Sequence, residues 1–254
     1  MLLAIDVGNT NTVLGLFDGD ELVESFRVKT DPRSTADEIE LQFRGLLAER
    51  PEITGIALCS TVPAVLKEMR GMLSKYYADV PQVIVEPGTK TGVPVLTDNP
   101  KEVGADRIVN TLAAHHLHGG PCIVVDFGTS TNLDVVSEKG EFLGGALAPG
   151  IEISLEALAG RAAQLRKVEL VPPRSVIGKN TVEALQSGAL YGFAGQVDGL
   201  VDRITDELDQ TPTAVIATGG LAPIVVPESE TITHHEPDLT LIGLRLIYER
   251  NVDE

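Results

Sequence analysis

Tryptophan is absent from this 254-residue sequence, aromatic residues make up only 4% of it, and cysteine occurs twice. Cys59 and Cys122 each lie in an apolar run and form no CxxC pair, so we expect two small core residues in a reduced compartment and no disulfide. No apolar run approaches the roughly 20 residues that span a bilayer. A strand-like run begins at residue 2, which leaves no room for a signal peptide. These absences predict a soluble cytoplasmic protein.

Basic residues are also scarce. Lys and Arg number 20 against 37 Asp and Glu, which gives a formal net charge of −17 and an isoelectric point near 4.6. Nucleic acids and anionic membranes both require basic patches, so the composition argues against either as the main partner. A nucleotide ligand is compatible with this charge, because it needs only a metal ion, backbone donors and a few basic residues.

One pattern occurs twice in the chain. Residues 2–17 read LLAIDVGNTNTVLGLF and residues 122–136 read CIVVDFGTSTNLDVV, so that in each case an apolar run ends in Asp-x-Gly and small polar residues lead into a second apolar run. Asp6 aligns with Asp126 and Gly8 with Gly128, and we expect this offset to stay constant through the turn. The chain is long enough for one large domain or two ordinary ones. The repeat favours two, at residues 1–119 and 120–254.

Each copy predicts a buried strand, a tight glycine-containing turn and a returning strand. Turns of Gly, Asn, Thr and Ser present backbone N–H groups and short side-chain donors that can surround a phosphate. The Asp at the strand end cannot bind phosphate directly, but it can hold a metal ion that does. A single copy would favour an ordinary β-hairpin, since Asp and Gly are common in turns. Two matched copies favour two half-sites that face one nucleotide.

The rest of the sequence predicts an α/β fold with three strands, a helix, a strand, a helix and a strand in the first half. After the first hairpin we expect a strand at 22–28, a helix capped by Ser34, a strand at 53–59, a helix at 62–77 and a strand at 82–86. In the second half we expect strands at 122–127, 131–136, 141–143, 213–217 and 232–234, a loop at 144–150 that enters a helix near Glu152, a long helix opened by 178–181 that ends at 208, and a final helix capped by Asp238.

Residues 87–103 contain three prolines, two glycines and no periodicity. Long connections without secondary structure are usually functional or disordered. This one leads into Gly104-Ala105-Asp106-Arg107 at the start of a helix that runs to about residue 118. Alone, these residues indicate a first-turn Asp that offsets the helix dipole and a solvated Arg. Beside two phosphate turns, Asp106 becomes a candidate general base and Arg107 a candidate clamp for an oxyanion or carboxylate.

The helix at 181–208 carries Gly188, Gly192, Gly195 and Gly199 on one stripe. Each interior glycine costs a helix about 0.5–1 kcal/mol relative to alanine, so the stripe needs a compensating reason. We expect it to contact another helix, either across a subunit interface or in the first half of the chain. Residues 218–220, Thr-Gly-Gly, predict a third glycine turn at the carboxyl end of a strand, where ligands of α/β sheets bind.

Histidines cluster at His115, His116 and His118, and again at His234 and His235. A zinc site needs ligands that converge, with Cys or carboxylate partners. The first three point around a helix and the last two lie in a strand, so the spacing favours solvated or helix-capping roles. The order of Ser, His and Asp required for a hydrolase is also absent.

Six spaced motifs resemble those of the type III pantothenate kinases, in the same order and over nearly the whole chain. They are DVGNTN at 6–11, GADR at 104–107, DFGTSTNLD at 126–134, GGALAPG at 144–150, GKNT at 178–181 and TGG at 218–220. The resemblance implies two duplicated ribonuclease-H-like domains with a mixed sheet in each, as in actin, hexokinase and the heat-shock chaperones. It also implies phosphorylation of pantothenate by ATP and Mg²⁺ to 4′-phosphopantothenate, the first step of coenzyme A synthesis. The enzyme would be a homodimer that requires a monovalent cation, K⁺ or NH₄⁺.

The same resemblance assigns roles to individual residues. ATP would be bound by Asp6, Val7, Gly8, Asn9, Thr10, Asn11, Thr12, Val13 and Thr129. Asp106 would accept the proton of the pantothenate hydroxyl. Pantothenate would contact Thr97, Gly104, Ala105, Asp106, Arg107 and Thr181, the last supplied by the partner subunit. Asp6 would hold Mg²⁺ and Asp126 would bind potassium.

Two positions depart from the family pattern. Thr97 replaces a tyrosine that lines the substrate pocket in many members, which would affect pantothenate affinity. Asn132 replaces a threonine and keeps a polar donor, so we expect less effect there. Two alternatives remain at this point: a non-catalytic transcriptional accessory factor on the same scaffold, and a kinase of another small hydroxy acid. The joint presence of Asp6, Asp106, Arg107 and Asp126 favours an enzyme, because a binding module needs no acceptor Asp.

Overall fold

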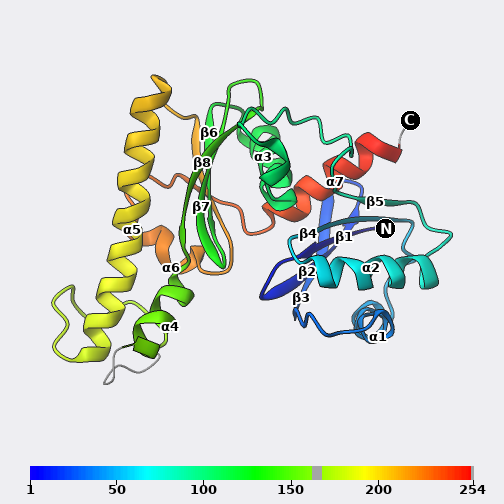
Figure 1. Ribbon diagram of the computed structural model, residues 1–254, viewed down its shortest axis with the longest axis horizontal. Helices are drawn as coiled ribbons and strands as arrows, with labels where there is room; N and C mark the ends of the chain where they lie inside the picture. The colour runs from blue at the N-terminus through cyan, green and yellow to red at the C-terminus, as the bar shows by residue number, and fades with distance from the viewer. Residues whose placement is uncertain (162–167, 253–254) are drawn as a thin grey trace. The chain divides into compact units, whose positions relative to one another are not determined.

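The computed structural model describes residues 1–161 and 168–252 (Figure 1). The chain forms two compact units. Unit 1 consists of residues 1–93, 99–113 and the chain from 240 onward, and unit 2 of residues 94–98 and 114–239. The C-terminal helix α7 (Leu239–Val252) therefore belongs almost entirely to the first unit, although it follows the second in sequence.

Each unit contains one five-stranded mixed sheet, and the two sheets have the same topology. In unit 1 the strand order is β3-β2-β1-β4-β5, and in unit 2 it is β8-β7-β6-β9-β10. In both, two antiparallel pairings are followed by two parallel ones. The first sheet contains β1 (Leu2–Val7), β2 (Asn11–Asp18), β3 (Glu21–Lys29), β4 (Gly55–Ser60) and β5 (Gln82–Ile84). The second contains β6 (Cys122–Phe127), β7 (Ser130–Val136), β8 (Phe142–Pro149), β9 (Ala214–Thr218) and β10 (His234–His235).

This repeated topology confirms the predicted fold class of two duplicated α/β domains with a mixed sheet in each. It also explains why the sequence pattern occurs twice. In both units the central strand is the one that ends in Asp-x-Gly, and its antiparallel partner follows directly in sequence.

In unit 1, large apolar side chains cover one face of the sheet. Alternate residues of β1, beginning with Leu3, pack with neighbours on β2 and β4 against α1 (Ala36–Leu47) and α2 (Pro63–Tyr76) (Figure 1). Side chains two apart on a strand share a face. The buried members of this cluster are Leu3, Ile5, Val7, Leu14, Leu16, Ile39, Phe43, Ile56, Leu58, Val65, Met69, Met72 and Leu73.

The other face of the first sheet is lined by small residues and accepts α7. A side chain at Gly15 would collide with Leu241, and one at Gly55 would collide with Tyr248. Glycines at these two positions therefore allow the helix to approach the strands closely. The buried Arg245 of α7 also forms an ion pair with Asp20, which connects the helix to the β2–β3 hairpin, and a second one with Glu249 on α7 itself.

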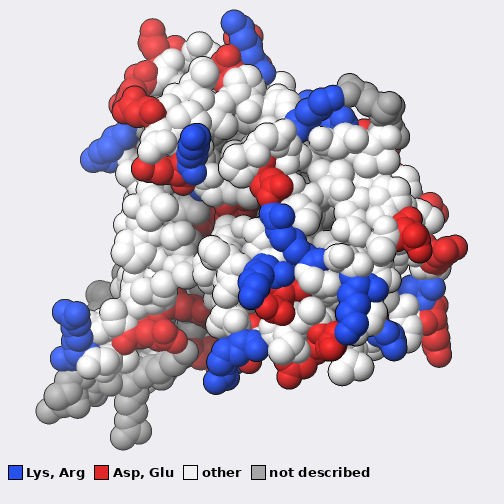
Figure 2. Space-filling model, turned by 45° about the vertical axis from the view of Figure 1, so that its right-hand side comes forward, with Lys and Arg blue, Asp and Glu red and all other residues white. Residues whose placement is uncertain are grey.

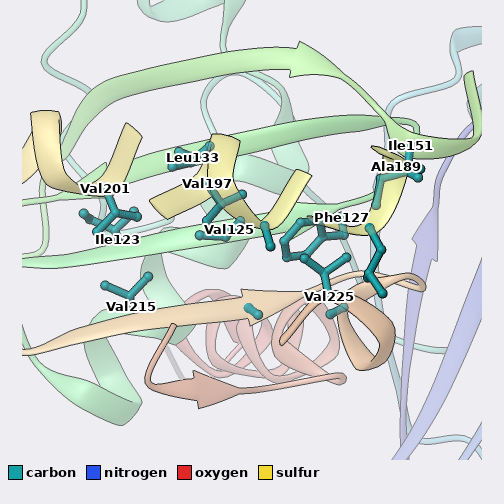
Figure 3. Close-up of a cluster of buried hydrophobic side chains, with 14 residues drawn as sticks. Ile123, Val125, Phe127, Leu133, Ile151, Ala189, Val197, Val201, Val215 and Val225 are labelled. Atoms are coloured by element: carbon teal, nitrogen blue, oxygen red, sulfur yellow. The ribbon is translucent and has the colours of Figure 1, made fainter. Parts of the chain in front are cut away.

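In unit 2, α5 (Thr181–Leu208) packs lengthwise on the sheet, with α4 (Ile151–Arg161) and the short α6 (Ala222–Val225) (Figure 1). Val197 and Val201 of α5 lie over Ile123 and Val125 of β6, and Phe127 lies among Val225 and the side chains of α4 and α5 (Figure 3). Burial of such side chains contributes about 1.5–3 kcal/mol each, which makes this cluster the main source of stability in the unit.

Several predicted boundaries differ from the structure. The N-cap of α1 is Thr35 rather than Ser34, because Thr35 forms a reciprocal capping box with Glu38. Residues 144–150 were expected to form a loop, which is wrong: they are most of β8. Its glycines and alanines hid the strand pattern, and Gly145 is required there because a side chain would strike the Leu133 carbonyl.

The connection at 87–103 is more ordered than its composition suggests. Val95 forms a β-bridge with Phe142 inside unit 2. A short 3₁₀ helix, η1 (Pro100–Glu102), then leads into α3 (Ala105–His118). A second 3₁₀ helix, η2 (Val226–Glu228), directly follows α6 in unit 2. Among the helices within the described ranges, none is both long enough and apolar enough to cross a membrane.

Two helical glycines of unit 1 provide a test of this packing. Gly243 of α7 lies against Val109 of α3, where an added Cβ would come within 2.6 Å of Val109 Cγ1, whereas Gly45 of α1 faces open space. We expect Gly243→Ala to lower the free energy of unfolding by about 1–3 kcal/mol. The matched Gly45→Ala should raise it by about 0.5–1 kcal/mol. Urea unfolding measures both, and a stabilised Gly243→Ala protein would contradict the packing.

Candidate functional site

The first Asp-x-Gly turn places Asp6 at the carboxyl end of two parallel strands. Asp6 lies near the end of β1, and the parallel register sets it directly beside Cys59 of β4. The Cys59 thiol donates a hydrogen bond to Asp6 Oδ1 over 3.3 Å. The carboxyl ends of parallel strands are where α/β sheets bind ligands.

The turn that follows Asp6 is closed by a hydrogen bond from the Gly8 N–H to the Asn11 carbonyl, 3.0 Å long. Asn9 and Thr10 are exposed at its tip. Thr12 is buried and its hydroxyl lies 2.9 Å from that of Thr30. Of the residues predicted to bind ATP, those at the tip can therefore offer side chains, whereas the buried Val7 and Thr12 support the turn from behind.

Asp106, in the first turn of α3, lies close enough to Asp6 to act on it electrostatically within unit 1. Its carboxylate is folded back over Gly104, where an added Cβ would lie 2.5 Å from Asp106 Oδ1. It accepts hydrogen bonds from the backbone N–H groups of Arg107 and of Asp106 itself. The predicted GADR segment thus delivers its acid to the same place as the first turn.

Burial dominates the electrostatics of both acids. The pKa of Asp6 is raised to about 6: burial raises it most, the Cys59 hydrogen bond lowers it, the Asp106 charge raises it and Arg27 lowers it. Burial also raises the pKa of Asp106, against the lowering effect of the Arg107 N–H and side chain. Two carboxylates with raised pKa values in one place are a recognised sign of a functional site.

Sequence reasoning missed two residues of this site. The sheet register aligns Arg27 of β3 with Val13 and Asp6, which puts the guanidinium on the same face as the acid, and Cys59 completes the row on β4. The alternation of exposed residues in β3 could have singled out Arg27. Cys59 gave no such signal, because only long-range strand pairing brings it beside Asp6.

The second turn, in unit 2, is one residue shorter than the first, which corrects the constant offset expected from the alignment. Its closing hydrogen bond runs from the Gly128 N–H to the Ser130 carbonyl over 3.0 Å. Asp126 pairs with Asn132, six positions on, whereas Asp6 pairs with a residue seven positions on. The structural counterpart of Thr12 is therefore Thr131.

Glycines from two other segments press against this second turn. Side chains at Gly150 would collide with the carbonyls of Gly128 and Thr129, and a Cβ at Gly219 would lie 2.5 Å from Asp126 Oδ1. Gly219 also has a φ of +92°, which favours glycine. The predicted glycine turn at 218–220 is thus confirmed, and backbone crowds around Asp126 while Thr129 stays exposed.

The remaining predicted residues are distributed over both units. Thr181 is the first residue of α5, which is capped by the Asn180 side chain through a 3.0 Å hydrogen bond from the Glu183 N–H. Thr97 belongs to unit 2, where its Oγ1 is buried and has no hydrogen-bond partner among the described residues. Arg107 belongs to unit 1 together with Asp106.

The histidines form interactions within unit 2. His118 is mostly buried, its Nε2 lies 3.1 Å from Glu236 Oε1, and its ring centre lies 4.4 Å from that of His234. The expectation that His118 is merely solvated or capping is therefore wrong, because its side chain packs against His234 of β10. His115 contacts the Glu138 carbonyl. Within residues 1–161 and 168–252, no three His, Cys, Asp or Glu side chains converge in a way that could hold a metal.

Comparison with known proteins identifies the family. Residues 2–203 match the family model described as type III pantothenate kinase. The chain belongs to the type III pantothenate kinase family. A protein of that name from Frankia alni is 72% identical over 99% of this chain and 100% of its own length, and one from Saccharopolyspora erythraea is 69% identical over 99% of both.

Solved structures with the same fold are more distant in sequence. The activator of 2-hydroxyisocaproyl-CoA dehydratase from Clostridium difficile, solved with bound ADPNP, has a TM-score of 0.59 at 13% identity and covers 99% of this chain and 95% of that one. A ROK hexokinase from Thermus thermophilus has a TM-score of 0.55 at 17% identity and covers 99% of both chains. At these identities the likeness concerns the fold.

The type III pantothenate kinase family fixes the reaction class. The chain is a kinase that phosphorylates an alcohol group of pantothenate in coenzyme A biosynthesis, and a kinase reaction of this class uses ATP with a divalent metal ion. The non-catalytic accessory factor considered from the sequence is therefore not favoured. Acidic and basic side chains are interspersed on the face shown in Figure 2.

The raised pKa of Asp6 predicts how stability depends on pH in the metal-free protein. The folded pKa of about 6 exceeds the ordinary value of 3.8 for an aspartate, so the folded state binds more protons between these values and stability falls as the pH rises through them. Above that window the ionised carboxylate costs on the order of 1–3 kcal/mol. We expect Asp6→Asn in EDTA to be more stable than the wild type near pH 8 and to lose this advantage near pH 4.

Urea unfolding at the two pH values measures the effect. Asp18→Asn removes an exposed carboxylate at the end of β2 and serves as the matched control. An advantage for Asp6→Asn that is equal at both pH values would refute the assignment.

Proposed function

We propose that Asp106 is the general base that takes the proton of the pantothenate hydroxyl during transfer of the γ-phosphoryl group of ATP. The observation that carries this proposal is the pair formed by Asp6 and Asp106, two acids with raised pKa values in one place at the carboxyl ends of β1 and β4. One acid of such a pair can serve a metal ion and the other a proton. Phosphoryl transfer needs both functions.

The reaction then proceeds as follows. The hydroxyl oxygen of pantothenate attacks the γ-phosphorus, the bond between that phosphorus and the ADP oxygen breaks, and the hydroxyl proton passes to an oxygen of Asp106. A base is most effective when its pKa approaches the working pH, and burial moves Asp106 in that direction. Arg107 follows on the same helix and is proposed to bind the pantothenate carboxylate, as Arg does in bidentate pairs. Gly104 and Ala105 complete this contact.

ATP is proposed to bind through its phosphates at residues 6–13. The exposed tip of the turn offers Asn9 and Thr10, with backbone donors at Gly8 and Asn11. Asp6 would hold Mg²⁺, which commonly binds one or two carboxylates and completes its shell with phosphate oxygens and water. When bound, the metal neutralises charge that develops on the phosphates. Thr129, exposed on the second turn, is proposed as a further ATP contact, and Thr97 and Thr181 as contacts to pantothenate.

A monovalent cation, K⁺ or NH₄⁺, is proposed at Asp126. Asn132 lies directly opposite Asp126 on the neighbouring strand, so the two side chains share a face. Asn132 is buried, and its Oδ1 accepts no hydrogen bond from the described residues. A buried oxygen in that state costs free energy unless it finds a partner. An ion beside the carboxylate would provide one.

We further propose a homodimer in which the partner subunit supplies Thr181. The described part of unit 2 exposes large apolar side chains on β8, on α4, in the segment before α5 and in the first turn of α5, which are Leu147, Ile153, Leu158, Val171, Val176, Ile177 and Val182. Exposed apolar patches of this kind mark interaction sites. Gly188, Gly192 and Gly195 on α5 have open space around them, which agrees with the expected helix contact between subunits.

The activity is tested by ADP release with pantothenate, with and without K⁺. We expect release that depends on both, and Asp106→Asn should lower kcat by about 10²- to 10⁴-fold, as loss of a general base does. Asp79→Asn, which changes an exposed acid of unit 1, is the matched control. Near wild-type turnover of a folded Asp106→Asn protein would exclude this residue as the base, and turnover with another hydroxy acid alone would exclude pantothenate.

The subunit contact is tested by Gly192→Leu. A leucine on the open glycine stripe should push the partner helix away, so we expect the variant to shift toward monomer in sedimentation velocity experiments. Gly45→Leu, on the open face of α1, should leave the association unchanged. A Gly192→Leu protein that keeps both its oligomeric state and its thermal stability would count against the contact.

A further inference from the structure

Cys59 is fixed beside Asp6 by the backbone. The parallel register of β1 and β4 pairs the two residues, and paired residues on neighbouring strands project from the same face. Cys59 has no accessible surface, and its Sγ lies 3.3 Å from Asp6 Oδ1. This distance is within the range for a thiol donor, and nothing about the thiol suggests contact with a substrate.

The hydrogen bond has a directional consequence for the carboxylate. A carboxylate at the end of a short side chain can rotate, and any rotation must be frozen when a metal ion binds. With Oδ1 held by the thiol, Oδ2 is left to face a ligand. Among the interactions of the described residues, the Cys59 thiol is the one side-chain donor to Asp6.

A thiol suits this position because it can donate a hydrogen bond to the carboxylate without adding a negative charge. The contact between Sγ and Asp6 Oδ1 has the length of such a bond. A second anion here would instead repel Asp6 and Asp106, whose charges already oppose each other.

We propose that Cys59 is a positioning residue whose thiol orients the Asp6 carboxylate for the metal ion of MgATP. The proposal rests on the proposed role of Asp6 in holding Mg²⁺. Simple core packing is the competing explanation, and Cys122 represents it: this second buried cysteine lies at the start of β6, and no side-chain hydrogen bond from it is found within the described residues.

The test compares Cys59→Val, which is apolar, somewhat larger and has no donor, with Cys59→Ser, which keeps a donor. Cys122→Val makes the same change in size at the other buried cysteine and is the matched control. Binding of Mn²⁺·ATP by the full chain is measured by electron paramagnetic resonance, together with thermal stability. Because a thiol is a weak donor, the loss of its hydrogen bond predicts that Cys59→Val weakens Mn²⁺·ATP binding by about threefold to tenfold. Cys59→Ser should bind within about twofold of the wild type, and Cys122→Val should be unchanged.

Steady-state kinetics give a second readout that packing would not affect. Cys59→Val should raise the Mg²⁺ concentration for half-maximal activity and leave the KM for pantothenate unchanged, with recovery in Cys59→Ser. If Cys59→Val does not fold, Cys59→Ala replaces it. Wild-type binding by the variant without a donor, or equally weak binding by Cys59→Ser, would overturn the proposal. A wild-type chain without pantothenate-dependent ADP release would refute the proposed function instead, while the binding comparison would still decide the role of Cys59.

Discussion

The organisation of unit 1 depends on holding two like charges close together inside the protein. Asp6 and Asp106 each have a raised pKa, mainly through burial, and the charge of Asp106 raises the pKa of Asp6 further. Such an arrangement is unfavourable for an isolated fold and becomes useful when a cation and a transferable proton are present. The elements around the pair can be understood by how they keep it in place: a strand end, a helix start and a glycine that leaves room for a carboxylate.

The two faces of the first sheet differ in the size of their side chains and in what they contribute. Large residues on one face bind α1 and α2 and provide the stability, whereas small residues on the other let α7 lie close to the strands. Asp6 and Cys59 belong to the face with the small residues. The helices that cover this face therefore determine which ligands can reach the two side chains. The chain therefore returns to its first unit at the end, with the buried Arg245 tied to Asp20 across more than 200 residues of sequence.

Local patterns predicted much of the fold, and long-range pairing accounts for what they missed. The succession of strands and helices along each half followed from the duplicated Asp-x-Gly motif and from the patterns of apolar residues. β8 was missed because its Gly144, Gly145 and Ala146 give no apolar alternation, and a close approach to Leu133 is what requires them. In the same way, Asp106 stood out by its loop and motif. Cys59 looked like any core residue, because its role depends on a strand register that spans 53 positions.

The one-residue difference between the two turns shows how a duplicated motif can acquire two roles. If the offset were constant, Val13 would correspond to Leu133, which lies in the apolar core of unit 2. The shorter second turn instead brings Asn132 into that position, opposite Asp126. Asp6 therefore has the apolar Val13 beside it, whereas Asp126 has the buried amide of Asn132. With the proposed roles, Asp6 would share its place only with Cys59 and the metal ion, and Asn132 would offer a second oxygen to the cation at Asp126. A one-residue difference in a turn, without any change of topology, would then be sufficient to give the two halves different ligands.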